Sequence, residues 1–235
     1  MQASVARQRE AVCVTTDGLA PHRVVQIAAE RAAARARVTV DAGAHMFPAT
    51  VLWPVRRPNG MLISNGLSTM GFALPAAIGA ALLLRSPAEA GHYHEHVYHE
   101  HVYHEHVYHE HVHKQVRDEH VVALTGDGGL LMCAGELSTV ARERLPIVIV
   151  VFNDASLSLI DVKQRQRRLE GSGVSIGPVN WRGVAESFGL PAYLARAERE
   201  LEDAMDCAFG HSGPAFVDVH VDPAGYGAML KAARG

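Results

Sequence analysis

The sequence has little cysteine and no long hydrophobic run, and these two shortages exclude several classes of protein. Its 235 residues contain only three cysteines, at the widely separated positions 13, 133 and 207, which predicts neither a disulfide framework nor a zinc knuckle. The longest apolar stretch, residues 70–84, is interrupted by Pro75 and two glycines and is shorter than the roughly 20 apolar residues that cross a bilayer. The basic N-terminus is not followed by the apolar core of a signal peptide. We therefore expect a reduced, soluble, cytoplasmic protein.

The sequence also lacks a large excess of charge of either sign. Lys and Arg together number 22 and Asp and Glu 25, for a formal net charge of -3. Four of the acidic residues belong to one histidine-rich repeat, so the rest of the chain is close to neutral. A near-neutral chain gives no electrostatic reason to expect binding to nucleic acid or to an anionic membrane. The hydrophobic content of 48% excludes intrinsic disorder for most of the chain.

Short β-branched runs alternate with helical patterns along the chain. The runs are continuously apolar, which is typical of strands that helices cover on both faces. We predict strands over residues 38–40, 121–125, 147–152 and 216–219, and helices over residues 24–36, 70–85, 130–144, 181–188 and 198–209. This alternation predicts an α/β protein with a three-layer α/β/α arrangement and a mostly parallel sheet. Residues 21–235 are assigned to this domain, and residues 1–20 to an N-terminal lead-in.

One histidine-rich insertion, residues 92–113, interrupts this alternation. The pentapeptide Tyr-His-Glu-His-Val occurs there four times in succession, and its period of five matches neither a helix face nor a strand face. One interpretation is a tandem expansion tolerated in a surface loop. The other is a loose site for Zn, Ni or Cu, because His96 and His99 would meet at i,i+3 on a helix. Since the insertion precedes the strand at 121–125, we expect it at the amino edge of the sheet, far from any ligand at the carboxyl edge.

A glycine-rich turn follows the strand at residues 121–125. Gly126, Asp127, Gly128 and Gly129 open a helix there, and backbone N–H groups at such a position favour a phosphate. A dinucleotide-binding fingerprint does not fit, because its third glycine would fall on a leucine and Asp127 would put a carboxylate among the phosphates. A divalent cation between Asp127 and the phosphates removes that conflict, and Mg²⁺ takes such oxygen ligands.

A second pair of polar residues follows the next strand. Asn153 and Asp154 end the apolar run at residues 147–152. Because parallel strands bring their carboxyl ends to one edge of the sheet, both pairs should lie together. Each pair alone is common in turns, but their spacing favours a metal and diphosphate site.

Together these motifs resemble the thiamine diphosphate-dependent enzymes of the acetolactate synthase and 2-oxoacid decarboxylase group, whose cofactor motif is GDG, some two dozen residues and then Asn-Asn. Residues 64–80, SNGLSTMGFALPAAIGA, resemble the GLGTMGFALPAAIGA block of that group. Residues 41–45, DAGAH, resemble the segment that opens its cofactor-binding domain. Outside the repeat the resemblance runs from about Gly18 to the C-terminus. It implies that residues 21–235 form a C-terminal domain that binds thiamine diphosphate and Mg²⁺.

The resemblance implies a metal site and a cofactor platform. Asp127, Asp154 and the Ser156 carbonyl would bind Mg²⁺, and a carboxylate at 154 suits a hard cation better than the family's amide. Met70 would lie beneath the cofactor and hold its two rings in a bent shape. The Ser68 carbonyl would accept a hydrogen bond from the aminopyrimidine. Without the surrounding residues 64–80, Met70 could equally well be interpreted as a methionine of the hydrophobic core.

The resemblance also implies which residues lie at the diphosphate. Backbone N–H groups of the turn formed by Gly126, Gly128 and Gly129 would hold it, and His45 would be near it. From the residues alone, His45 is better interpreted as an ordinary polar loop residue. Both interpretations stay open at this stage.

Two departures from the group concern the reaction itself. In the group, the glutamate that promotes loss of the thiazolium C2 proton lies in a separate pyrimidine-binding domain, and only about 40 residues precede Asp41. We therefore expect no catalytic residue here: the activating glutamate should be absent, and the chain should correspond to the C-terminal part of a longer enzyme. Lys163 stands where acetolactate synthases have the tryptophan that lines the acceptor pocket, which argues against acetolactate synthesis.

Three functions follow from these observations. The first is a thiamine diphosphate- and Mg²⁺-binding enzyme half that acts on a small 2-oxoacid by decarboxylation or carboligation, as a homo-oligomer or with a separate pyrimidine-domain subunit. The second is a remnant that binds the cofactor without turnover, and the third is a histidine-rich metal-binding protein on this scaffold. Neither nucleic acid nor a membrane is an expected partner. The loop at residues 171–175 either closes over the site or is a linker.

Overall fold

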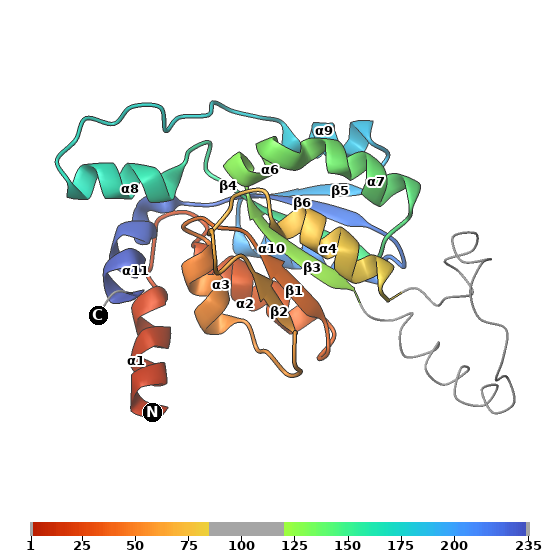
Figure 1. The fold of residues 1–235 in the computed structure, drawn as a ribbon, viewed down its shortest axis with the longest axis horizontal. Helices are drawn as coiled ribbons and strands as arrows, with labels where there is room; N and C mark the ends of the chain where they lie inside the picture. Colours follow the sequence, from red (N-terminus) through yellow and green to blue (C-terminus); the bar gives the residue numbers. More distant parts are fainter. Residues whose placement is uncertain (1, 85–119, 234–235) are drawn as a thin grey trace, which may run out of the picture.

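Six parallel strands form one sheet in the order β2-β1-β3-β4-β6-β5 (Figure 1). The computed structural model describes residues 2–84 and 120–233, so the histidine-rich insertion and its predicted location lie outside the described residues. The strands are β1 (Arg37–Val40), β2 (Met61–Ile63), β3 (Val121–Gly126), β4 (Ile147–Asn153), β5 (Ala192–Ala195) and β6 (Ala215–His220). The all-parallel sheet confirms the predicted α/β class, and β1, β3, β4 and β6 confirm all four predicted strands.

Helices cover both faces of this sheet and complete the three layers (Figure 1). The helices of the described chain are α1 (Gln2–Val12), α2 (Pro21–Arg31), α3 (Met46–Leu52), α4 (Ala73–Leu82), α6 (Asp127–Cys133), α7 (Leu137–Arg142), α8 (Ser158–Gln166), α9 (Trp181–Ser187), α10 (Glu198–Gly210) and α11 (Tyr226–Ala233). In the described parts of the chain, no helix is long and apolar enough to cross a membrane.

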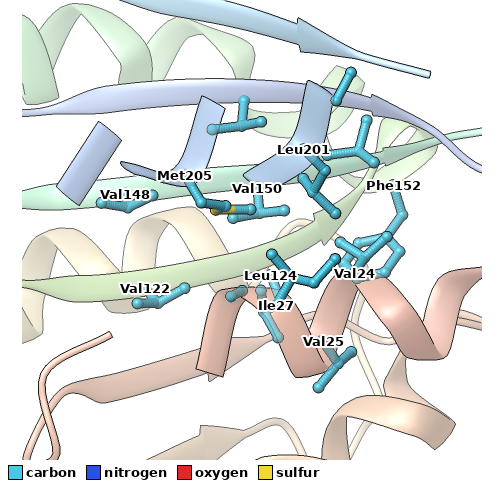
Figure 2. Packing of buried hydrophobic residues seen from close by; sticks show 14 of the residues in the cluster. Val24, Val25, Ile27, Val122, Leu124, Val148, Val150, Phe152, Leu201 and Met205 are labelled. Atoms are coloured by element: carbon cyan, nitrogen blue, oxygen red, sulfur yellow. The ribbon is translucent and has the colours of Figure 1, made fainter. Parts of the chain in front are cut away.

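One face of the sheet packs against α2, α3 and α10. Alternate residues of β3 and β4 point to this face, as successive strand side chains must, and Leu124 and Val150 are fully buried there. Figure 2 shows Ile27 of α2 beside Leu124, and Met205 of α10 beside Val150. The interleaved strand residues, among them Ile149, point to the other face and pack with α4, α7 and α9. Burial on both faces explains why the strands are continuously apolar.

Three predicted helices have clearly different bounds in the structure. The helix predicted over residues 24–36 is α2, which spans Pro21–Arg31. The helix predicted over residues 70–85 begins only at Ala73, because Gly71 has a φ of 73° and the backbone N–H groups at the helix start bond to the Asp41 side chain. The helix predicted over residues 130–144 begins earlier, at Asp127. It is then broken by a 3₁₀ turn, Ala134–Glu136, before α7.

The predicted lead-in contains a helix that packs onto the rest of the chain. Val12 at the end of α1 is buried in a small cluster with Tyr226 and Met229 of α11. Ala44, which lies in the loop between β1 and α3, belongs to the same cluster. The first and last helices of the described chain therefore lie side by side, next to the carboxyl edge of the sheet (Figure 1).

Candidate cofactor site

One cavity of about 390 Å³ lies at the carboxyl ends of β1, β3 and β4, where open α/β sheets bind their ligands. All the site residues expected from the sequence line it: His45, Ser68, Met70, Gly126, Asp127, Gly128, Gly129, Asp154 and Ser156. Asn153 does not line this cavity; its side-chain amide instead donates to the buried Asp218 carboxylate of β6 at 2.9 Å. The sheet thus brings together three loops that are far apart in the sequence.

Asp127 is the most buried acidic residue that lines the cavity. It begins α6, its side chain is 3% exposed, and its carboxylate accepts three backbone N–H groups. Oδ1 accepts from Gly128 at 2.7 Å, and Oδ2 accepts from Ala155 at 2.7 Å and Asp154 at 3.2 Å. Burial raises the pKa of Asp127, and the three N–H groups oppose that shift. The backbone therefore fixes this carboxylate between the ends of β3 and β4.

Asp154 supplies a second carboxylate beside the first. Its Oδ2 accepts the Ser158 hydroxyl at 2.6 Å, and its Oδ1 accepts the Ser156 backbone N–H at 3.1 Å. Burial, the main cause, and the neighbouring Asp127 raise the pKa of Asp154 to about 7, against the opposing effect of the Ser158 hydroxyl. All of these hydrogen-bond donors are neutral. A divalent cation between the two carboxylates would offset both desolvation and mutual repulsion, which makes the pair a suitable hard-cation site.

The glycines of the turn are required by close contacts across the cavity. A Cβ at position 128 would lie 2.5 Å from Leu157 Cδ2 and 3.3 Å from Met70 Cε. A Cβ at position 129 would collide with the Asp41 carboxylate. No side chain projects from the backbone at these positions, so a diphosphate can approach the turn closely, although the Gly128 N–H donates to Asp127 Oδ1 in this structure. This backbone cradle fits the diphosphate of thiamine diphosphate.

Asp41 organises the loop that carries Ser68 and Met70, a role that the sequence analysis missed. Its fully buried carboxylate accepts the backbone N–H groups of Gly71, Phe72 and Ala73 at 3.1, 2.6 and 2.8 Å. It also accepts the Thr125 hydroxyl of β3 at 2.7 Å. Asp41, which directly follows β1, thus caps the N-terminus of α4. The sequence feature that could have indicated this role is an acidic residue directly after β1, in the DAGAH segment.

His45 is buried, unlike an ordinary polar loop residue. Its side chain is 4% exposed and its ring stacks on Phe152 with the centroids 5.1 Å apart. Among the described residues, its buried Nε2 has no hydrogen-bond partner. Burial lowers the pKa of His45 to about 4, with a smaller opposing effect of Asp41, so the ring is neutral at pH 7. A neutral imidazole can offer a ligand one hydrogen bond, but no charge.

Helix α8, which was not predicted, forms an apolar wall of the cavity. Leu157 and Ile160, close to Asp154 in the sequence, line it, and Lys163 lines it from the following turn. The loop predicted over residues 171–175 rests on this wall: Val174 accepts the Leu157 N–H at 2.7 Å, and Ser175 pairs with Ser156 in an antiparallel bridge. That loop therefore contacts the site. The sequence did not predict α8 because its hydrophobic pattern is weak: every residue of the helix except Ser158 is half-exposed or exposed.

A family model decides the relationship of this chain to known proteins. The model for the C-terminal TPP binding domain of thiamine pyrophosphate enzymes matches residues 41–219, most of the chain. This chain belongs to the thiamine pyrophosphate enzymes. Its membership confirms the resemblance inferred from the GDG turn and residues 64–80, and the cavity described above lies within the matched segment.

Acetolactate synthases are prominent among the relatives of this thiamine pyrophosphate enzyme domain. The chain is 31% identical to the acetolactate synthase of Bacillus subtilis over 185 residues, which cover 79% of this chain and 27% of that protein. It is 29% identical to the large subunit of acetolactate synthase isozyme 1 of Escherichia coli over 222 residues, 92% of this chain and 34% of that protein. The chain therefore spans about a third or less of the length of these curated relatives.

Proposed function

We propose that this chain is the part of an acetolactate synthase-like enzyme that binds thiamine diphosphate through Mg²⁺. The observation that carries the proposal is the pair of carboxylates, the buried Asp127 and the half-buried Asp154, beside the glycine turn in one cavity. With the Ser156 carbonyl they would supply three oxygen ligands, and the cofactor's phosphates would complete the shell, as Mg²⁺ sites commonly arrange. Within the described residues, no cluster of three acidic, histidine or cysteine side chains competes with this site for a metal.

The remaining residues of the cavity would bind the rest of the cofactor. The Gly129 N–H would donate to the diphosphate, and so would the Gly128 N–H if it exchanged its present bond to Asp127 for one to the cofactor, with Gly126 and the neutral His45 ring alongside. Met70, whose Cε lies close to position 128, would support the thiazolium ring from the protein side, and the Ser68 carbonyl would accept a hydrogen bond from the aminopyrimidine. When bound, thiamine diphosphate supplies the nucleophilic carbon and the electron sink that decarboxylation of a 2-oxoacid needs.

The reaction would need a residue from outside this part of the enzyme. No glutamate lines the cavity within the described residues, although the cavity holds every cofactor-binding residue expected from the sequence. The proposed partner is a pyrimidine-binding domain on a second copy of a longer chain or on a separate subunit, and it would supply the activating glutamate. The proposed substrate is a small 2-oxoacid.

Calorimetric titration of the chain with thiamine diphosphate and Mg²⁺, followed by addition of pyruvate, tests this function. We expect cofactor binding without release of CO₂, since the cavity holds the binding residues and no glutamate lines it within the described residues. Turnover by the chain alone would contradict the need for a partner. Absence of binding would contradict the proposed function and favour a remnant that keeps only the fold.

A further inference from the structure

Lys163 is the one lysine or arginine that lines the cofactor cavity within the described residues. The other ionisable groups of the lining are Asp127 and Asp154, which the proposed metal would neutralise, and His45, which is neutral at pH 7. With the two carboxylates neutralised, Lys163 is the one side chain of the described lining that keeps its charge, apart from the charges that a bound cofactor brings. That positive charge is available for a ligand group of opposite sign.

The position of Lys163 separates it from the metal-binding end. Ser158, at the start of α8, donates its hydroxyl to Asp154. Lys163 lies five residues further along the same helix, about 7.5 Å along its axis at the usual rise of an α-helix. Between the two, Leu159 and Ile160 make the wall apolar. The backbone of Lys163 therefore lies further along α8 than the apolar stretch that lines the cavity.

Local ion pairs do not occupy Lys163. Its neighbour Arg165 pairs with Asp161 across one helical turn at 2.9 Å and does not line the cavity. Lys163 is exposed and pairs with none of the acidic residues in the described parts of the chain. A long, unpaired cationic side chain at a cavity wall can engage an anionic group without breaking an existing contact.

The chemistry of decarboxylation indicates which anionic group this would be. A cation against the carboxylate that leaves as CO₂ would stabilise the ground state more than the transition state and slow the reaction. The apolar wall near the metal-binding end suits that carboxylate better. Building on the proposed function, we propose that Lys163 selects 2-oxoacids that carry a second anionic group at the end remote from the ketone. Lys163 is then a specificity-determining residue of this site.

The test compares two ligands of equal chain length. The full chain, loaded with thiamine diphosphate and Mg²⁺, is titrated calorimetrically with 2-oxoglutarate and, separately, with 2-oxopentanoate. We expect the dicarboxylate to bind more tightly, and Lys163→Gln to weaken its binding roughly ten- to a hundredfold, the usual range for a hydrogen bond to a charged group. The same substitution should leave 2-oxopentanoate binding unchanged. Arg165→Gln, which removes the same charge from the same helix outside the cavity, should change neither.

The cofactor affinity of each variant separates this inference from the proposed function. If Lys163→Gln weakens binding of thiamine diphosphate itself, Lys163 contacts the diphosphate and the inference is wrong. Equal binding of the two 2-oxoacids, or no binding of either to the cofactor-loaded chain, would also overturn it while the proposed function stands. If the wild-type chain does not bind the cofactor, the proposed function fails and this inference fails with it.

Discussion

The Asp127 carboxylate accepts the backbone N–H of Ala155 at 2.7 Å, although the two residues are 28 positions apart in the sequence. The parallel register of β3 and β4, which sets Gly126 opposite Phe152, brings them together. Ala155 adopts a φ of 56°, a conformation that non-glycine residues rarely adopt, and the hydrogen bond to Asp127 holds its N–H in place. The candidate metal site is thus preorganised by the centre of the sheet before any ligand binds.

Asp41→Ala should destabilise the fold and weaken the site together. The substitution removes the acceptor of three backbone N–H groups and of the Thr125 hydroxyl, all at a fully buried position. We expect the free energy of unfolding to fall by about 3 kcal/mol or more, as unsatisfied buried donors cost. Urea denaturation followed by circular dichroism measures this. Thr125→Val, which breaks one of these bonds, should cost only about 1 kcal/mol. Similar small losses for both variants would contradict the role given to Asp41.

Gly128→Ala should reduce cofactor affinity far more than stability. The added Cβ would meet the ends of two flexible side chains, Leu157 at 2.5 Å and Met70 at 3.3 Å, which can shift, but it would also intrude on the diphosphate cradle. We expect a loss of tenfold or more in thiamine diphosphate affinity by calorimetry, roughly 1.4 kcal/mol. Gly135→Ala is the matched control, because nothing lies within 4 Å of its added Cβ. Undiminished affinity of Gly128→Ala would show that the turn does not hold the cofactor.

His45 should make the chain without cofactor less stable in mild acid. Its pKa is about 4 when folded against an ordinary value of 6.5, so the unfolded chain takes up the proton first as the pH falls. The stability contributed by the neutral ring is present above pH 6.5 and is lost toward pH 4. This amounts to about 2 kcal/mol between pH 7 and pH 5. His45→Phe, which keeps an aromatic ring against Phe152, should remove that part of the pH dependence in urea denaturation. If the variant and the wild type show the same pH dependence of stability, His45 is not the source of that dependence.

The central strands were predictable from the sequence, and the edges of the sheet were not. β3 and β4 are continuously apolar because helices cover both of their faces, and that pattern is visible without a structure. β2 has only three residues, all half-buried, and β5 has four, mostly half-buried, so neither carries a periodic signal. The late start of the helix predicted over residues 70–85 depends on the long-range bonds to Asp41, which no local pattern encodes.

For the candidate site, sequence reasoning found the residues whose chemistry depends on a local motif. Asp127 and its glycines follow a strand directly, and Asp154 follows the next one, so topology alone brings them together. Met70 and Ser68 came from the family resemblance, because a methionine or serine in a loop has no chemical signature of its own. The wall built by α8 and the contribution of Leu230 from α11 depend on packing between distant elements, which spacing does not reveal.

The most direct measurement of the central claim is calorimetric titration of thiamine diphosphate into wild-type chain and Asp127→Asn, each with Mg²⁺ and with the metal removed by a chelator. Asn keeps the size of the side chain and one acceptor oxygen, and circular dichroism controls for folding. We expect tight binding only by the wild type with Mg²⁺, and a loss of a hundredfold or more in affinity both for the variant and without metal, about 2.7 kcal/mol. Equal affinity of a folded Asp127→Asn variant and the wild type, or binding indifferent to Mg²⁺, would contradict the metal-bridged diphosphate site.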